Sequence, residues 1–190
     1  MSYRVFTALD LSQSVTSNIL DYQKNLEQHF PPILRWIKAD QLHITLKFVG
    51  ELQENHLHPL QNKMRGIFSE VEKFQLQLQG SGIFPSARNP RILWVGIQPS
   101  QKLLEVVNKN ESVFQTFGYP TEKRPFQAHI TIARFKEDYP QKEWTQFQLL
   151  WKTQKNDFQT QQNIDHLTLY QSTLTRQGPI YKILTKVDFR

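Results

Sequence analysis

Two short segments of alternating polar and apolar residues constrain the fold of this chain more than any other feature. HITLKFVG, which begins at His43, places that histidine and Thr45 on one side and apolar residues on the other. Side chains alternate along a β-strand, so the pattern predicts a strand with one buried face and an imidazole beside a hydroxyl on the other. HITIARF repeats the arrangement with His129 and Thr131, 86 residues later and close to half of the 190-residue length.

The rest of the sequence alternates between the periodicities of strands and helices. We expect Pro31 and Pro32 to end one helix, because proline resists helix, and Gly50 and the glycines at 80 and 82 to end strands. The patterns predict strands over 3–11, 42–50, 73–84, 91–98, 127–135, 163–174 and 179–189, helices over 14–30, 55–69, 99–118 and 140–152, and a turn over 175–179.

The repeat at half-chain spacing predicts two related lobes. We expect an α+β fold in which each pseudo-symmetric lobe is a small antiparallel sheet backed by helices, and in which the lobes face each other across a central cleft. Residues 1–190 would then form a single bilobal domain. Each wall of the cleft would contribute one histidine and one threonine.

The composition narrows both the chemistry and the location. The chain has no cysteine, which excludes disulfides, thiolate catalysis and cysteine-ligated metal clusters. No apolar run approaches the roughly 20 residues that cross a bilayer, and the first residues lack the layout of a signal peptide. We therefore expect a cytoplasmic protein without a membrane partner. The net charge of +6 favours an anionic partner such as phosphate or nucleic acid.

Two histidines on opposite walls suit in-line attack on phosphorus. One imidazole, neutral, can take a proton from water, while the other, protonated, gives a proton to the departing oxygen. The threonine hydroxyls can donate hydrogen bonds to the non-bridging oxygens. Direct protonation of the leaving group makes a metal unnecessary, and we expect neither a metal nor another cofactor.

Several segments resemble a known family. HITL and HITI resemble the paired H-x-T-x motifs of the two-histidine (2H) phosphoesterases, and RVFTALDL, LHITLKFVGE, PRILWVGI, AHITIARF and LYQSTLTRQGPIYKIL resemble its RNA 2′,3′-cyclic phosphodiesterase branch, formerly called 2′-5′ RNA ligases. The resemblance covers essentially the whole chain and implies hydrolysis of a terminal RNA 2′,3′-cyclic phosphate to a 2′-phosphate. It implies His43 as the acid that protonates the leaving 3′ oxygen and His129 as the base. RNA 3′ ends, tRNA fragments among them, would be the partner of a monomeric enzyme.

The resemblance also suggests a phosphate-binding cation, Arg134, five residues after His129. Strict alternation places Arg134 on the opposite face of the strand, so this role requires a bulge that turns the side chain inward. By the same alternation Lys47 shares the face of His43, where it would either meet phosphate or solvate the sheet edge.

Two other functions stay open. The first keeps the catalytic groups but changes the reaction, either to hydrolysis of small cyclic nucleotides or ADP-ribose cyclic phosphate, or to 2′-5′ RNA ligation as the reverse step. The second is a module that binds RNA ends with little catalysis, although a pure binder has no need of two proton-transfer groups.

Further histidines and aromatic residues compete for a role. HLTL, which begins at His166, is a third match to the pattern; we expect it not to be catalytic and leave substrate contact open. His56 and His58 lie at a predicted helix start, where side chains two residues apart diverge, so surface positions are expected rather than a metal site. Phe84 and Trp94 are candidates for stacking on a base, but Trp94 lies in a strand that is apolar on both faces and is expected in the core.

Overall fold

The computed structural model describes residues 1–153, 156–176 and 178–190. Its strands are β1 (Ser2–Asp10), β2 (Leu34–Trp36), β3 (His43–Gln53), β4 (Phe74–Ser86), β5 (Asn89–Ile97), β6 (His129–Phe135), β7 (Gln159–Ile164), β8 (His166–Thr175) and β9 (Gly178–Asp188). Its helices are α1 (Gln13–His29), α2 (Glu54–Phe68), α3 (Gln101–Gln115) and α4 (Gln141–Thr153), with a 3₁₀ turn at Ala39–Gln41.

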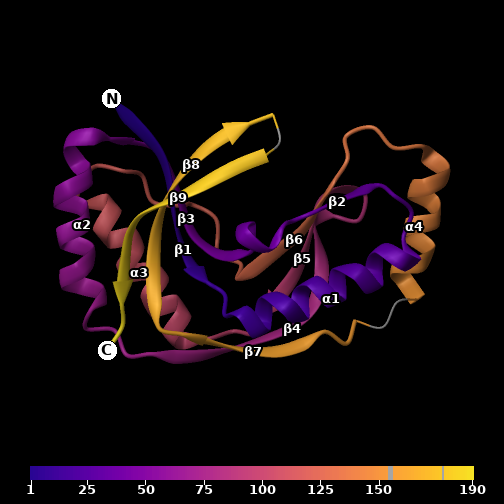
Figure 1. Ribbon diagram of the computed structural model, residues 1–190, viewed down its shortest axis with the longest axis horizontal. Coiled ribbons are helices and arrows are strands. Elements are labelled where there is room, and N and C mark those ends of the chain that lie inside the picture. Colours follow the sequence, from indigo (N-terminus) through magenta and orange to yellow (C-terminus); the bar gives the residue numbers. More distant parts are fainter. Residues whose placement is uncertain (154–155, 177) are drawn as a thin grey trace.

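Two antiparallel sheets form two lobes (Figure 1). The first lobe contains the sheet β3-β1-β8-β9, which α2 and α3 cover on the side away from the second lobe. The second contains the sheet β2-β6-β5-β4-β7, with α1 and α4. The predicted α+β fold with two facing lobes is confirmed.

The lobes are interleaved along the chain and do not correspond to its two halves. After β1 the chain crosses to the second lobe for α1 and β2 and then returns for β3. After β7 it returns again, so that β8 and β9 complete the first sheet and both termini lie in the same lobe (Figure 1). Each lobe is therefore closed by segments far apart in sequence.

Apolar periodicity and polar N-caps explain where α1 and α3 begin and which faces they bury. In α1 the residues Val15, Ile19 and Leu26 are almost fully buried and recur at the spacing of one helical face. The hydroxyl of Ser12 accepts a hydrogen bond from the Val15 N–H at 3.3 Å, and Ser100 caps α3 in the same way. No helix among the described residues is both long and apolar enough to cross a membrane.

Three strand boundaries were predicted wrongly. Gly50 does not end β3; it adopts a φ of 81° at a register shift and the strand continues to Gln53. The register of β4 likewise shifts around Gly80 without ending the strand, which continues through Gly82 to Ser86. The predicted strand over 163–174 is in fact the end of β7 and most of β8, which belong to different sheets and separate at Asp165. Of the predicted turn over 175–179, residue 177 lies outside the described residues.

Candidate active site

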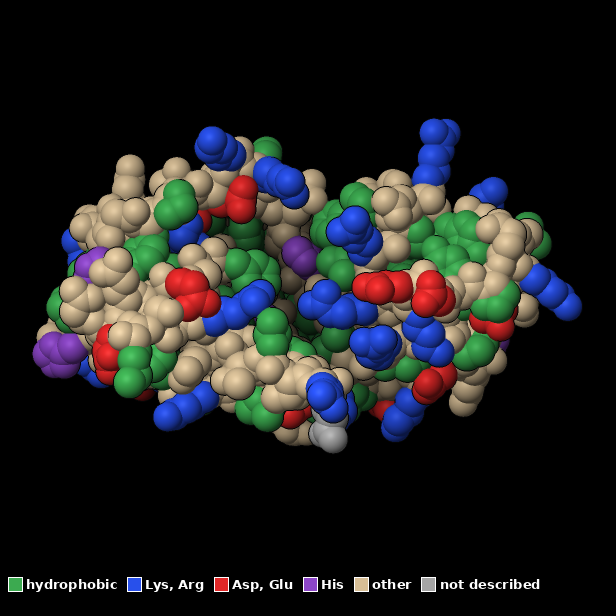
Figure 2. Space-filling view, turned by 90° about the horizontal axis from the view of Figure 1, so that it is seen from above, with side chains coloured by type: hydrophobic (Ala, Val, Ile, Leu, Met, Phe, Trp, Pro, Cys, Tyr) green, Lys and Arg blue, Asp and Glu red, His purple; other side chains and the backbone are tan. Residues whose placement is uncertain are grey.

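A cavity of about 520 Å³ lies between the lobes, and both His-x-Thr pairs line it. His43 and Thr45 come from β3 in one lobe, and His129 and Thr131 come from β6 in the other. Figure 2 shows a hollow in the middle of this face, with a histidine side chain inside it and Lys and Arg side chains around it. The structure thus brings the four predicted residues to one place.

The charged groups of this cavity, apart from the histidines, are all cations. None of its described lining residues is acidic. Guanidinium groups bind phosphate oxygens in a bidentate manner, so this lining suits a phosphorylated ligand. The cationic lining residues are Arg35, Lys38, Arg134 and Arg176.

Both histidines are held by the same local contact. The Nδ1 atom of His43 lies 2.7 Å from the carbonyl oxygen of Gln41, and that of His129 lies 2.7 Å from the carbonyl oxygen of Gln127. A carbonyl oxygen only accepts, so we assign the ring proton to Nδ1 in both cases. Each Nε2 then carries a lone pair in the neutral ring and can accept or, once protonated, donate a proton in the cleft.

A phenylalanine packs against each imidazole. The ring centroid of Phe6 is 5.0 Å from that of His43, and the centroid of Phe84 is 5.1 Å from that of His129. Tyr181 adds an edge contact to His43 at 5.5 Å. These apolar contacts fix the ring orientations and remove water from one side of each imidazole.

Burial lowers the pKa of both histidines. At His43 this effect outweighs the hydrogen bond to the Gln41 carbonyl and the nearby charge of Asp10, which both favour the protonated ring, while His129 and Arg134 lower the pKa further. At His129 burial outweighs the hydrogen bond to Gln127. Both rings are therefore mainly neutral at pH 7 in the free protein, and a bound phosphate anion would favour protonation of one of them.

A β-bulge turns Arg134 toward His129. Thr131 pairs with Trp94 and Ala133 pairs with Leu93, which leaves Ile132 as an extra residue in β6. The alternation is inverted after the bulge, so Arg134 returns to the face of His129 and lines the cavity. The bulge that an inward-facing Arg134 requires is therefore present in β6.

The bulge is anchored by the residue that follows β2 and by α1. The carbonyl oxygen of Ile132 accepts hydrogen bonds from the Ile37 N–H at 2.9 Å and from the side chain of Gln23 at 2.7 Å. Gln23 lies on α1, is buried, and also donates to the Ile37 carbonyl. A buried polar group without partners is costly, so this amide stabilises the backbone shape that orients Arg134.

β3 has a corresponding bulge, which makes the prediction for Lys47 wrong. Thr45 pairs with Ala8 and Lys47 pairs with Thr7, so Leu46 is the extra residue and Lys47 points away from His43. The ammonium group is buried and donates to Glu111 at 2.7 Å and to the Pro120 carbonyl at 2.8 Å. Lys47 therefore joins α3 to the sheet and does not belong to the face of His43.

Phe48 takes the place in β3 that Arg134 takes in β6. Each lies five residues after its histidine, and the residues from His43 to Phe48 have the same burial pattern as those from His129 to Arg134. The Phe48 residue is 75% exposed, more than the other exposed apolar residues on strands, Leu174, Ile180 and Ile183. The pseudo-symmetry thus places a cation on one wall of the cleft and an exposed aromatic ring on the other.

A second cavity, of about 670 Å³, continues from the first beyond Phe48. Thr45, Phe48 and His129 line both cavities. Its aromatic lining residues are Phe48, Phe84 and Phe126. Trp94 lines neither cavity; it lies half-buried against Phe84, with 4.9 Å between ring centroids, and so supports Phe84 rather than reaching a ligand.

The remaining histidines lie outside these cavities. His56 contacts the hydroxyl of Tyr119 at 3.0 Å, and His58 contacts Asn62 within the same helix. His166 contacts Asp10. Within the described parts of the chain, no three His, Asp or Glu side chains lie close enough together to hold a metal ion.

Comparison with known proteins assigns the family. The model of the 2′-5′ RNA ligase superfamily matches residues 16–176. The chain belongs to this superfamily. It is an enzyme of the phosphoesterase class, and the resemblance to the two-histidine phosphoesterases is confirmed.

Relatives in the 2′-5′ RNA ligase superfamily match nearly the whole chain. An RNA 2′,3′-cyclic phosphodiesterase of Aeropyrum pernix is 32% identical, with 81% of this chain and 85% of the relative covered. One of Thermotoga maritima is 28% identical, with 98% and 95% covered. The crystal structure of E. coli LigT complexed with 3′-AMP superposes with a TM-score of 0.78 at 27% identity and covers 100% of this chain and 99% of that one.

Proposed function

We propose that this enzyme hydrolyses the terminal 2′,3′-cyclic phosphate of RNA to a 2′-phosphate, by acid–base catalysis between two histidines and without a metal. The observation that carries the proposal is the pair of imidazoles, one from each lobe, in a single cavity whose other charged groups are cations. The names of the superfamily relatives, RNA 2′,3′-cyclic phosphodiesterases, support the choice of substrate.

The proposed reaction uses each residue at a defined atom. Nε2 of His129 accepts a proton from water as the water oxygen attacks phosphorus. The bond from phosphorus to the 3′ oxygen breaks, and His43, protonated in the complex, donates a proton from Nε2 to that oxygen. Thr45, Thr131 and Arg134 stabilise the charge on the non-bridging oxygens.

The second cavity favours an RNA end over a cyclic phosphate on a smaller ligand. A nucleobase attached to the bound ribose can stack on the exposed ring of Phe48, and such stacking contributes about 1–3 kcal/mol per base. Preceding phosphates can bind the cations of the first cavity. An anionic strand with a terminal base uses both features, whereas a cyclic mononucleotide uses one.

The test is incubation of the purified protein with an RNA oligonucleotide that ends in a 2′,3′-cyclic phosphate, followed by location of the product phosphate by ³¹P NMR. We expect a 2′-phosphate, the same rate with and without EDTA, and a kcat/KM at least about 10-fold above that of a cyclic mononucleotide. A 3′-phosphate would contradict the assigned leaving oxygen. An RNA that is bound but survives would favour an end-binding module instead.

A further inference from the structure

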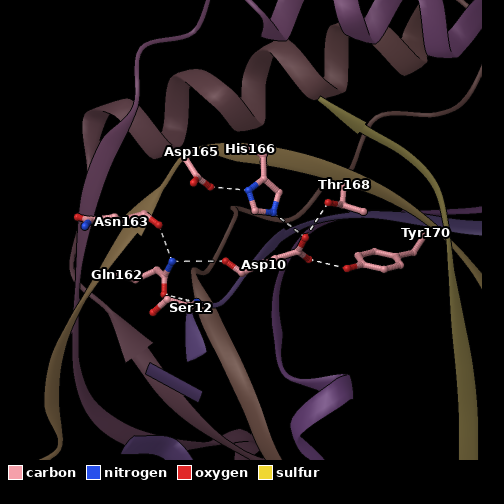
Figure 3. Close-up of polar contacts among 8 residues, drawn as sticks. All are labelled: Asp10, Ser12, Gln162, Asn163, Asp165, His166, Thr168 and Tyr170. Carbon is pink, nitrogen blue, oxygen red and sulfur yellow. Dashed lines mark hydrogen bonds and ion pairs between the residues drawn. The ribbon is translucent and has the colours of Figure 1, made fainter. Parts of the chain in front are cut away.

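The third His-x-Thr pair lies on β8, and both of its side chains contact the carboxylate of Asp10 (Figure 3). The side chain of Asp10 accepts hydrogen bonds from Nε2 of His166 at 2.7 Å, the hydroxyl of Thr168 at 2.8 Å and the hydroxyl of Tyr170 at 2.6 Å. The three donors are two residues apart, so they share one face of β8. In β8 the His-x-Thr pattern thus has a different role, because it binds the carboxylate of Asp10 at the end of β1.

Asp10 is kept ionised by these donors. Burial by itself would raise the pKa of Asp10, but the hydrogen bonds from His166, Tyr170 and Thr168 outweigh it and hold the pKa below its usual value. The hydrogen bond to Asp10 raises the pKa of His166, with burial opposing and Asp165, bonded to its Nδ1, reinforcing the rise. Burial and the bond to Asp10 also raise the pKa of Tyr170, which therefore remains a donor.

The position of Asp10 makes the two catalytic histidines unequal. In the ladder between β1 and β3, Asp10 is the direct partner of His43, and antiparallel partners share a face. In the corresponding ladder between β5 and β6, the partner of His129 is Gly96, which carries no charge. An ionised carboxylate therefore lies beside His43, and His129 has no such partner on β5. Glu111 and Glu122 line the second cavity together with His129, but Glu111 accepts a hydrogen bond from Lys47 and Glu122 accepts one from the Arg124 N–H.

The other groups around His43 do not supply this negative charge. The charge of Asp10 favours the protonated form of His43, whereas His129 and Arg134 disfavour it. The ring of Tyr181 makes an edge contact with the imidazole of His43. The other charged or titratable side chains that line the cavity are Arg35 of β2, Lys38, His129 and Arg134 of β6, Arg176, and Tyr181 of β9.

We propose that Asp10, held by His166, Thr168 and Tyr170, is a positioning residue that favours a proton on His43 rather than on His129 when a substrate phosphate is bound. The catalytic role of the proton on His43 rests on the proposed function. The Asp10 carboxylate beside His43, with none on the strand partner of His129, is a feature of the free protein. It accounts for the third motif and gives a structural reason for His43, rather than His129, to act as the acid.

The test is titration of the histidine ring protons by NMR in the wild type and in Asp10→Asn. We expect the pKa of His43 to fall by about 0.5–1 unit and that of His129 to stay unchanged. With the cyclic-phosphate RNA, kcat/KM of the variant at pH 7.5 should then fall about 3–10-fold, and the difference should shrink as the pH is lowered. A loss of equal size at every pH would point to a structural role and overturn the proposal.

Two further variants keep the test independent of folding and of the proposed function. Asp21→Asn makes the same charge change at an exposed site on α1 and should leave the titration of His43 unchanged. Tyr170→Phe removes one hydrogen bond but leaves the Asp10 charge, so it should shift His43 much less than Asp10→Asn. If His43 and His129 respond equally to Asp10→Asn, the proposal is wrong, whether or not the wild type cleaves RNA.

Discussion

Replacement of either His43 or His129 with alanine should lower kcat on a cyclic-phosphate RNA by roughly 10²–10⁴-fold. A general acid or base contributes a factor of this size, which corresponds to about 3–5 kcal/mol in the activation barrier. Each imidazole serves one side of the phosphorus, and neither can replace the other from its own wall of the cleft. Single-turnover rates at saturating RNA measure the effect on the chemical step directly.

The matched control is His29→Ala. His29 is the exposed last residue of α1, and its Nδ1 contacts a carbonyl of its own helix. This variant should retain wild-type turnover, and all three variants should keep the circular dichroism spectrum of the parent. Near-normal turnover in a folded His43→Ala or His129→Ala variant would refute the acid–base assignment.

Arg134→Met should lower kcat/KM by about 10²-fold. The guanidinium is fixed toward the cleft by the bulge at Ile132, and a preorganised donor to a phosphoryl oxygen is worth about 3 kcal/mol. Arg134→Lys keeps the charge but loses the bidentate geometry, so we expect it to recover only part of the loss. Steady-state kinetics on the cyclic-phosphate RNA distinguish the three proteins.

Arg91→Met is the control for the loss of one positive charge. Arg91 is exposed on the neighbouring strand β5 and lines neither cavity. It precedes Ile92, the partner of Arg134, so alternation along β5 points its side chain to the other face of the sheet, and the variant should reduce kcat/KM by no more than about twofold. If Arg134→Met lowers kcat/KM no more than Arg91→Met does, Arg134 does not bind the substrate phosphate.

The paired motifs could be located from sequence because local alternation alone determines them. His43 and Thr45 are two residues apart on a strand, and so are His129 and Thr131, so each pair shares a face whatever the rest of the chain does. The half-chain spacing then predicted two lobes. It could not show that the lobes are interleaved, because that depends on which strands pair across long separations.

The bulges were beyond the reach of strict alternation. The sequence ITLKF gives no sign that Leu46 is unpaired, because bulges depend on the neighbouring strand and on partners such as Gln23 for the second one. This is why the side of Lys47 was predicted wrongly and why Phe48 was not recognised as a ring that lines the cavities. The matching offset of five residues after each histidine was the one available signal.

Two other features were missed for different reasons. β7 has the sequence QTQQNI and only two buried side chains, so it lacks the apolar pattern of a strand; its pairing with β4 defines it. Asp10 is the last residue but one of the first predicted strand, and its contact with the third His-x-Thr pair joins residues 156 positions apart. Sequence spacing could identify that pair as unusual without showing what it binds.

The pH dependence of kcat/KM for the wild type shows whether one charged and one neutral imidazole act on the same phosphorus. The base must lose its proton and the acid must keep its own, so the profile should be bell-shaped, with both limbs belonging to the pair. Because burial lowers the pKa of both histidines, the maximum should lie below their ordinary pKa of 6.5. A rate that is flat between about pH 5 and 8, where an unperturbed imidazole changes its charge, would rule out His43 and His129 as an acid–base pair.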